Sequence, residues 1–256
     1  MIQLENLTFQ YPQGPVVFKN FNLKIDLRAS WVVLGPSGCG KTTLLYLLSG
    51  LRLPTSGNVV INGSVITHPR PQTGLILQDY GLLPWSTVRQ NVELGLQIRN
   101  FYGPDGKHAP EKRIPLENVD HWLQRLGLDS IQQKIPQNIS GGQRQRTAIA
   151  RTLVLEPDIL LMDEPFASLD APSRDGLQKL TIELWKEQDL TLILVTHSIE
   201  EAALMGQYIL LLGNPPISEP CIIENFESHS MEFRDTDDYQ IRIRQLRSLM
   251  EEYEKT

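Results

Sequence analysis

Gly35-Pro36-Ser37-Gly38-Cys39-Gly40-Lys41-Thr42 matches G-x-x-x-x-G-K-[ST], the pattern of loops that bind phosphate groups. An apolar run, 31–34, precedes the motif and a helix-like run, 42–48, follows it, which is the strand–loop–helix context that it requires. The glycines let backbone N–H groups converge on phosphate oxygens, and the helix N-terminus adds the positive end of a dipole. We therefore expect a nucleotide site in which Lys41 reaches the β- and γ-phosphates and the Thr42 hydroxyl binds Mg²⁺. This context disfavours the alternative of an ordinary glycine-rich turn.

Composition excludes several other classes of protein. The chain has 256 residues, 41% of them hydrophobic, and a net charge of −6, which argues against a nucleic-acid binder with a basic surface. Two cysteines, Cys39 and Cys221, make no disulfide framework or metal cluster, and a reducing compartment is expected. No apolar run approaches the ~18 residues that span a bilayer, and no signal-peptide core is present. The sequence therefore predicts a soluble intracellular protein, unless a partner holds it at a membrane.

The pattern of apolar runs predicts an α/β fold. Strands are expected at 2–9, 17–25, 31–34, 59–61, 74–77, 159–162, 192–195 and 208–212. Helices are expected at 87–98, 116–126, 141–154, 172–188, 198–205 and 236–254, with a polar loop at Gly103-Pro104-Asp105-Gly106. Because apolar runs alternate with helices, we expect parallel strands covered on both faces. Residues 79–155 then form a helical lobe inserted into this core.

We expect residues 1–212 to form the nucleotide-binding domain and residues 213–256 to form a C-terminal extension. The extension ends in the predicted helix 236–254, whose apolar residues recur at spacings of three and four. Asp237 and Asp238 in its first turn favour the helix dipole. Two alternatives stay open for this helix: it docks on the core, or it binds a partner.

Two carboxylates, Asp163 and Glu164, follow the buried run 159–162. They are expected at the carboxyl end of a parallel strand, the edge at which open α/β sheets bind ligands. There Asp163 would hold Mg²⁺, mostly through water, and Glu164 would polarise the attacking water as a general base. The alternative is a solvated Asp-Glu turn.

A further glycine motif, Ser140-Gly141-Gly142-Gln143, precedes a helix that carries three arginines. Glycines at a helix N-terminus form an anion site, although one nucleotide does not need two such sites. Taken alone, the motif is equally well explained as a glycine-containing helix cap.

The order of these motifs in one chain resembles the nucleotide-binding subunit of ATP-binding cassette (ABC) transporters. The phosphate loop is followed by I-S-G-G-Q, D-E-P, S-L-D and T-H, and the resemblance runs from Met1 to Leu212. It implies a P-loop ATPase core with an antiparallel β-subdomain and an inserted helical subdomain. It also implies that two copies, as a homodimer, enclose two ATP molecules, each between one phosphate loop and the other copy's S-G-G-Q. Pairing with a different ATPase is the open alternative to the homodimer.

The resemblance implies a role for each matching residue. Gln78 would touch Mg²⁺ or the attacking water and also the transmembrane partner. His197 would contact the γ-phosphate, Tyr11 would stack on adenine, and Asp170 would lie at the dimer interface. Alternatives are a polar strand end for Gln78, a capping histidine for His197 and a surface aromatic for Tyr11. The expected catalytic residues are Lys41, Gln78, Glu164 and His197, and the expected metal ligands are Thr42, Gln78 and Asp163. The expected nucleotide contacts are Tyr11, Gly35, Pro36, Ser37, Gly38, Cys39, Gly40, Lys41, Thr42, Thr43, Ser140, Gly141, Gly142 and Gln143.

Two positions depart from the family pattern. Ile139 stands where the family usually has leucine, and Arg28-Ala29 stands where it usually has Gly-Glu. Neither change removes a catalytic group, so we interpret them as divergence without loss of activity.

The stretches 78–85 and 165–171 look like those of importer ATPases for nitrate, sulfonate, taurine or thiamine-precursor uptake. This implies a separate transmembrane permease, an extracytoplasmic solute-binding protein acting indirectly, and a peripheral position at the cytoplasmic face of the cell membrane, without nucleic acid. Leu82-Leu83-Pro84-Trp85 would line the groove for the permease's coupling helix, or else form a local hydrophobic cluster. Residues 213–256 are too few for the extra regulatory domain of some importer ATPases.

The competing function class is a soluble ABC ATPase that acts without a permease, in DNA repair, cluster assembly or translation. A repair-type member would need a long insertion between Gln78 and Ser140, and a translation-type member would carry two cassettes in one chain. A module that only binds ATP is a third class, which the presence of Glu164 and His197 disfavours.

Overall fold

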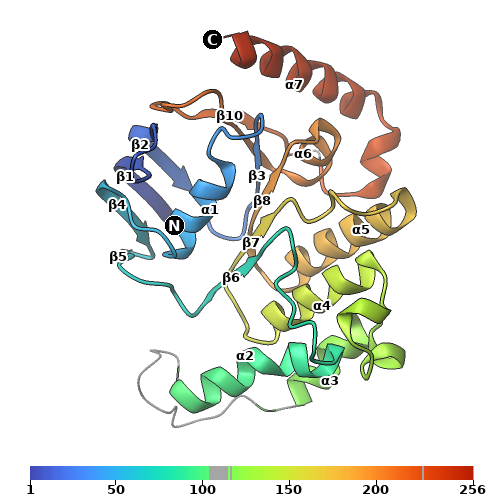
Figure 1. The fold of residues 1–256 in the computed structure, drawn as a ribbon. Helices are drawn as coiled ribbons and strands as arrows, with labels where there is room; N and C mark the ends of the chain where they lie inside the picture. Colours follow the sequence, from blue (N-terminus) through green and yellow to red (C-terminus); the bar gives the residue numbers. More distant parts are fainter. Residues whose placement is uncertain (104–114, 116, 227, 256) are drawn as a thin grey trace.

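The centre of the molecule is a six-stranded sheet with the strand order β10-β9-β3-β8-β7-β6 (Figure 1). The computed structural model describes residues 1–103, 115, 117–226 and 228–255. Five strands run parallel, and β10 pairs antiparallel with β9. The strands are β3 (Ser30–Leu34), β6 (Thr73–Ile76), β7 (Ile159–Asp163), β8 (Thr191–Thr196), β9 (Tyr208–Leu211) and β10 (Cys221–Glu224). The predicted parallel sheet is confirmed, whereas the sequence did not predict β10.

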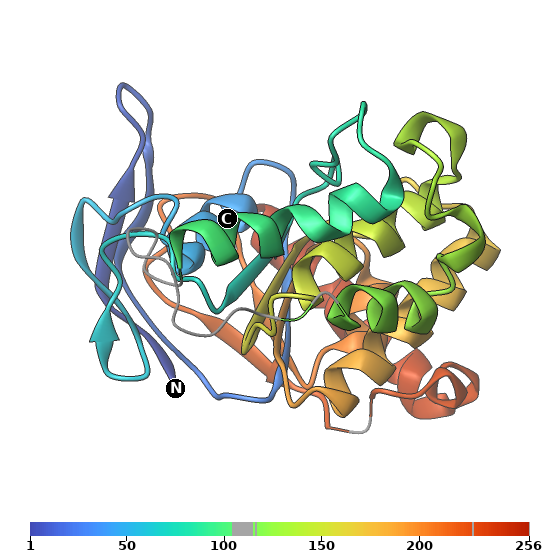
Figure 2. The same ribbon diagram turned by 90° about the horizontal axis from the view of Figure 1, so that it is seen from below.

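A second, antiparallel sheet is built almost entirely from the N-terminal part of the chain, as expected. Its strand order is β2-β1-β4-β5. The strands are β1 (Ile2–Gln10), β2 (Val16–Ile25), β4 (Ser56–Ile61) and β5 (Ser64–Val65), of which β5 was not predicted. Helix α1 (Lys41–Ser49) lies between the two sheets and buries its leucines there (Figures 1 and 2).

Alternate residues of the central strands enter two separate hydrophobic cores. On β3, Val32 and Leu34 face the helices that follow α1, whereas Trp31 and Val33 face α1 and the antiparallel sheet. Successive side chains of a strand point to opposite faces, so a strand buried on both faces has a continuous apolar sequence. This is why the short apolar runs 31–34, 159–162 and 192–195 predicted these strands correctly.

The predicted helical lobe is inserted between β6 and β7. It contains α2 (Val88–Tyr102), α3 (Glu117–Arg125), α4 (Gly141–Leu153) and two short 3₁₀ helices, Asp129–Ile131 and Pro136–Asn138. Helix α2 extends past its predicted end at residue 98, and Gly103 closes it by donating its N–H to the Arg99 carbonyl. Of the predicted polar loop, residues 104–106 lie outside the described residues. Helices α5 (Ala171–Glu187) and α6 (Ile199–Met205) follow β7 and β8.

The terminal helix α7 (Asp237–Lys255) follows a 3₁₀ helix, Met231–Asp235, and docks on α6. Tyr239, Ile243 and Leu246 are buried in the core shared with the lobe, and the Tyr239 hydroxyl donates to the Glu200 carbonyl. The docked alternative is therefore correct for this helix. Among the described residues, no helix combines the length and apolar character needed to cross a bilayer.

Candidate functional site

The phosphate-loop sequence forms one wall of a pocket of about 340 Å³ at the carboxyl ends of the parallel strands. Lys41 is 6% exposed, and its ammonium donates to the carbonyls of Gly35 (2.9 Å) and Pro36 (2.7 Å). The pocket is lined by Tyr11, Pro15, Val17, Ser37, Gly38, Gly40, Lys41, Thr42, Thr43, Glu164 and Pro215. The loop and the helix start thus present polar groups to one cavity, as the motif predicts.

Three of the predicted loop contacts, Gly35, Pro36 and Cys39, do not line this pocket. Gly35 packs so closely that a Cβ there would lie 2.5 Å from the Leu212 carbonyl oxygen and 2.8 Å from Cys39 Sγ. Cys39 is buried, and burial raises the pKa of its thiol. In the described structure, these three residues lie on the side of the loop away from the pocket, where they support its conformation.

Thr42 and Asp163 meet beside the loop. The Thr42 hydroxyl donates to Asp163 Oδ2 at 2.9 Å. Asp163, the last residue of β7, is 7% exposed; burial raises the pKa of its carboxyl, and the Thr42 hydrogen bond opposes that rise. A hydroxyl and a carboxylate oxygen held together are ligands that Mg²⁺ prefers, so the donor set fits this ion. No cluster of three or more His, Cys, Asp or Glu side chains accompanies them in the described part of the chain.

Glu164 and His197 lie together at the ends of adjacent strands. His197 Nδ1 is 3.2 Å from Glu164 Oε2, with the Glu164 side chain 20% exposed and that of His197 60% exposed. The Glu164 backbone has φ 44, a left-handed conformation that is uncommon outside glycine, and its N–H donates to the Val195 carbonyl. The bend after β7 therefore turns Glu164 back toward the end of β8, which His197 follows.

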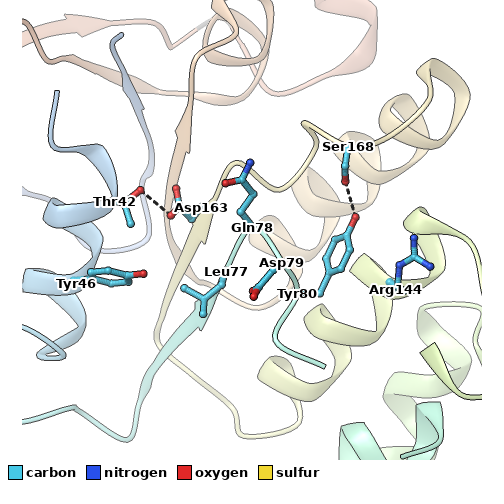
Figure 3. A pocket seen from close by; sticks show the side chains of 9 residues that line it. All are labelled: Thr42, Tyr46, Leu77, Gln78, Asp79, Tyr80, Arg144, Asp163 and Ser168. Atoms are coloured by element: carbon cyan, nitrogen blue, oxygen red, sulfur yellow. Dashed lines mark hydrogen bonds between the residues drawn. The ribbon is translucent and has the colours of Figure 1, made fainter. Parts of the chain in front are cut away.

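Gln78 enters a second pocket, of about 680 Å³, that shares Thr42 with the first (Figure 3). Its lining is Thr42, Tyr46, Leu77, Gln78, Asp79, Tyr80, Arg144, Asp163 and Ser168. Gln78 follows β6, the neighbour of β7, so the sheet brings it beside Thr42 and Asp163. The three predicted metal ligands are thus gathered in one cavity.

Tyr11 follows β1 directly and lines the pocket that contains Lys41. Its hydroxyl is 3.1 Å from Thr43 Oγ1, and Phe9 packs edge-on against its ring at 4.9 Å. The Arg52 guanidinium lies 5.9 Å from the ring centroid. The tyrosine is therefore held at the pocket by its own strand and by α1.

The Ser140–Gln143 segment begins α4 and forms a capping box. Ser140 Oγ accepts from the Gln143 N–H at 3.2 Å, and Gln143 Oε1 accepts from the Ser140 N–H at 2.9 Å. These four residues are absent from the lining of both pockets described above. Asp170 caps α5 by accepting from the Ser173 N–H and hydroxyl, which lowers the pKa of its carboxyl. Within one copy of the chain, neither segment joins the phosphate loop.

Several residues near the site were missed from the sequence. Pro15, Val17 and Pro215 complete the Tyr11 pocket, and Tyr80, Arg144 and Ser168 complete the Gln78 pocket. Glu201 is 6% exposed and accepts from the Thr196 hydroxyl at 2.5 Å, and burial raises the pKa of its carboxyl. The only sequence signal for Glu201 was its position four residues after His197. That spacing does not distinguish a buried carboxylate from one at the surface.

Comparison with known proteins agrees with this geometry. Residues 18–167 match the family model described as ABC transporter. The chain is 41% identical over 219 residues to the taurine import ATP-binding protein TauB of Roseobacter denitrificans, which covers 84% of this chain and 78% of that protein. It is 38% identical over 210 residues to the nitrate import ATP-binding protein NrtD of Synechococcus elongatus, covering 82% of this chain and 74% of the relative.

Comparison with solved structures also finds ATP-binding cassettes. The chain resembles the dimeric post-hydrolysis state of an ATP-binding cassette bound to ADP and Pi, with a TM-score of 0.73 and 31% sequence identity. The match covers 88% of this chain and 98% of the solved one.

Proposed function

The chain belongs to the ABC transporter family of ATP-binding proteins, and we propose that its ATP hydrolysis powers the import of a small solute through a separate membrane permease. The observation that carries the proposal is the grouping of Lys41, Thr42, Asp163 and Glu164 around connected pockets. The import names of the taurine and nitrate relatives add the direction of transport. These names favour a small oxyanion, such as a sulfonate or nitrate, as the solute.

In the proposed reaction, each pocket residue acts on ATP or on the attacking water. Lys41 binds the β- and γ-phosphates, and Tyr11 stacks on the adenine. Glu164 accepts a proton from the water that attacks the γ-phosphate, and His197, 3.2 Å away, contacts the γ-phosphate oxygens. Thr42, Asp163 and Gln78 would hold Mg²⁺, which when bound neutralises charge on the phosphate oxygens.

We propose a homodimer with two ATP molecules at its interface. The placement of Ser140–Gln143 outside the pocket that contains Lys41 supports this arrangement, because a second copy could supply the segment. The resemblance to a dimeric cassette that holds ADP and Pi supports it as well. Ser140, Gly141 and the backbone of α4's first turn would then contact the γ-phosphate held by the other copy.

The proposed partner is a transmembrane permease, which holds the protein at the cytoplasmic face of the cell membrane. Trp85 supports this assignment, since its side chain is 75% exposed, whereas a tryptophan in a local hydrophobic cluster would be buried. Leu82, by contrast, packs partly against the core. An extracytoplasmic solute-binding protein would act on this chain only through the permease.

The test is reconstitution of the full chain with its cognate permease in lipid vesicles, with the solute-binding protein added on the solute side. We expect ATP hydrolysis to rise when the binding protein carries its solute, and solute to accumulate only when ATP is present. ATPase activity that responds instead to DNA or ribosomes, with no permease that stimulates it, would overturn the importer assignment.

A further inference from the structure

Tyr80 lies two residues after Gln78, and its backbone is fixed by helix α4. Its φ is +65, in the left-handed region that non-glycine residues seldom adopt. Arg151 of α4 donates to the Tyr80 carbonyl at 2.8 Å and to the Gly81 carbonyl at 2.6 Å. The Tyr80 N–H donates to the Leu77 carbonyl. The turn after Gln78 is therefore fixed both by Arg151 and by a hydrogen bond within its own backbone.

The Tyr80 side chain points away from Gln78, toward the segment that links β7 to α5. Its hydroxyl is hydrogen-bonded to the hydroxyl of Ser168, at 2.6 Å. Figure 3 marks this hydrogen bond with a dashed line. The Arg144 guanidinium lies over its ring, 5.8 Å from the centroid. One side chain thus contacts both α4 and the segment Ser168–Asp170.

Leu169, the residue after Ser168, also contacts neighbouring helices. Its carbonyl accepts from Arg174 Nη2 at 2.9 Å. Gly141, at the start of α4, leaves room for it, since a Cβ there would lie 3.3 Å from Leu169 Cδ2 and 3.8 Å from the Tyr80 hydroxyl. The turn after Gln78, the start of α4 and the segment Ser168–Asp170 therefore meet at Tyr80.

We infer that Tyr80 is a positioning residue that ties the turn at Gln78 to the segment Ser168–Asp170 through its hydrogen bond to Ser168. A displacement of Gln78 then moves Ser168 and, with it, the capping residue Asp170. This rests on the proposed function, in which Trp85, in the segment that follows Gln78, binds the permease and two copies form a dimer, with Asp170 expected at the dimer interface. Tyr80 itself touches no reacting atom in this assignment.

A double-mutant cycle on the purified full chain tests the hydrogen bond between Tyr80 and Ser168. Tyr80→Phe and Ser168→Ala each remove one partner of the same hydrogen bond, while Tyr80→Phe keeps the ring under Arg144. We expect each single variant to lower kcat for ATP hydrolysis about two- to tenfold, the range for one hydrogen bond, with KM for ATP within about twofold of wild type. The double variant should lose no more than either single variant.

Tyr208→Phe is the matched control, because it removes a tyrosine hydroxyl on β9 that lines neither of the two pockets. It should keep wild-type kcat. The inference would be overturned by losses that multiply in the double variant, by a wild-type kcat in Tyr80→Phe, or by an equal loss in Tyr208→Phe. The double-mutant cycle measures ATP hydrolysis by the chain without a permease. Its result can therefore be interpreted even if vesicle reconstitution contradicts the importer function.

Discussion

The backbone of Glu164 adopts φ 44 directly after β7, and its carboxylate lies 3.2 Å from His197 Nδ1, where it can act on the attacking water. The strand 159–162 and its two following carboxylates predicted which residue would be available as a base. The positive φ of Glu164 and its distance from His197 depend on how β7 and β8 align, which no local pattern encodes. The same holds for Tyr80 and Ser168, which are far apart in sequence and were not predicted to meet.

Glu164→Gln tests the general base. The amide cannot accept the proton, so we expect kcat to fall by ~10²–10⁴-fold, which corresponds to about 3–5 kcal/mol of barrier. ATP binding should persist, and the variant should accumulate as an ATP-bound dimer on size exclusion. Glu5→Gln, on an exposed position of β1, is the control. A kcat for Glu164→Gln within about threefold of wild type would remove Glu164 from this role.

His229 gives a pH dependence of stability. It is 5% exposed, with its ring 4.9 Å from that of Trp185, and burial lowers its pKa from 6.5 to about 4, with Lys186 adding to the effect. The unfolded chain therefore binds a proton at a higher pH than the folded chain. The stabilisation is complete above about pH 6.5 and is lost as the pH falls toward 4.

Urea unfolding at pH 7.5 and pH 4.5 measures this effect. Between these values, the free energy of unfolding should fall by about 2–3 kcal/mol more in the wild type than in His229→Asn. Asparagine is the suitable replacement because it tolerates the φ of +85 at this position. Equal losses in the two proteins would show that His229 does not titrate as the burial requires.

At the scale of elements, long or strongly apolar segments were predictable and short edge strands were not. Strands β3, β7 and β8 are buried on both faces, so their sequences are apolar throughout. Strand β10 spans only Cys221–Glu224 and pairs with β9 alone, and β5 has two residues, so neither produces a periodic pattern. The pairing of β10 depends on where β9 lies in the folded sheet.

The phosphate loop packs on the end of β9, which Gly35→Ala tests. The added Cβ would meet the Leu212 carbonyl, a backbone atom that cannot turn aside. We expect a loss of about 1–3 kcal/mol in unfolding free energy, the usual cost of overpacking, together with weaker binding of a fluorescent ATP analogue. Both follow from one displacement of the loop.

Gly176→Ala is the control for this substitution. Gly176 lies inside α5, where a Cβ makes only an ordinary contact at 3.9 Å, so alanine should stabilise the helix by up to about 1 kcal/mol. If Gly35→Ala were as stable as Gly176→Ala and bound the analogue normally, the loop would not depend on this packing.

At the scale of the whole molecule, the proposed site is complete only when two copies combine. Lys41→Ala and Ser140→Arg should each abolish hydrolysis as homodimers, because every composite site then lacks either the phosphate-loop lysine or the opposite helix start. A mixed dimer has one site with both defects and one with neither. Mixing the two variants should therefore restore part of the activity, measured on heterodimers isolated through two different affinity tags. Inactive heterodimers would count against a shared site.

The proposed permease surface belongs to the same scale, because it acts only in an assembly with a partner. Trp85→Ala should weaken binding to the permease by about 2 kcal/mol or more, roughly 30-fold in Kd, because an exposed tryptophan serves as an interface anchor. The melting temperature should stay at the wild-type value. Ile241→Ala, at an exposed position of α7, is the control and should leave permease binding unchanged. A large drop in melting temperature for Trp85→Ala would identify this residue as part of the core.

The central sheet also allows the residues packed on its two faces to evolve separately. Side chains at alternate positions of one strand belong to different cores, and the faces of a sheet are far enough apart for substitutions across it to act independently. A lineage can therefore accumulate changes among the lobe helices without disturbing the leucines of α1 behind the phosphate loop. Descendants of one ATPase could in this way vary the lobe while they keep Lys41 and the phosphate loop, provided that Gln78 and the start of α4 stay unchanged.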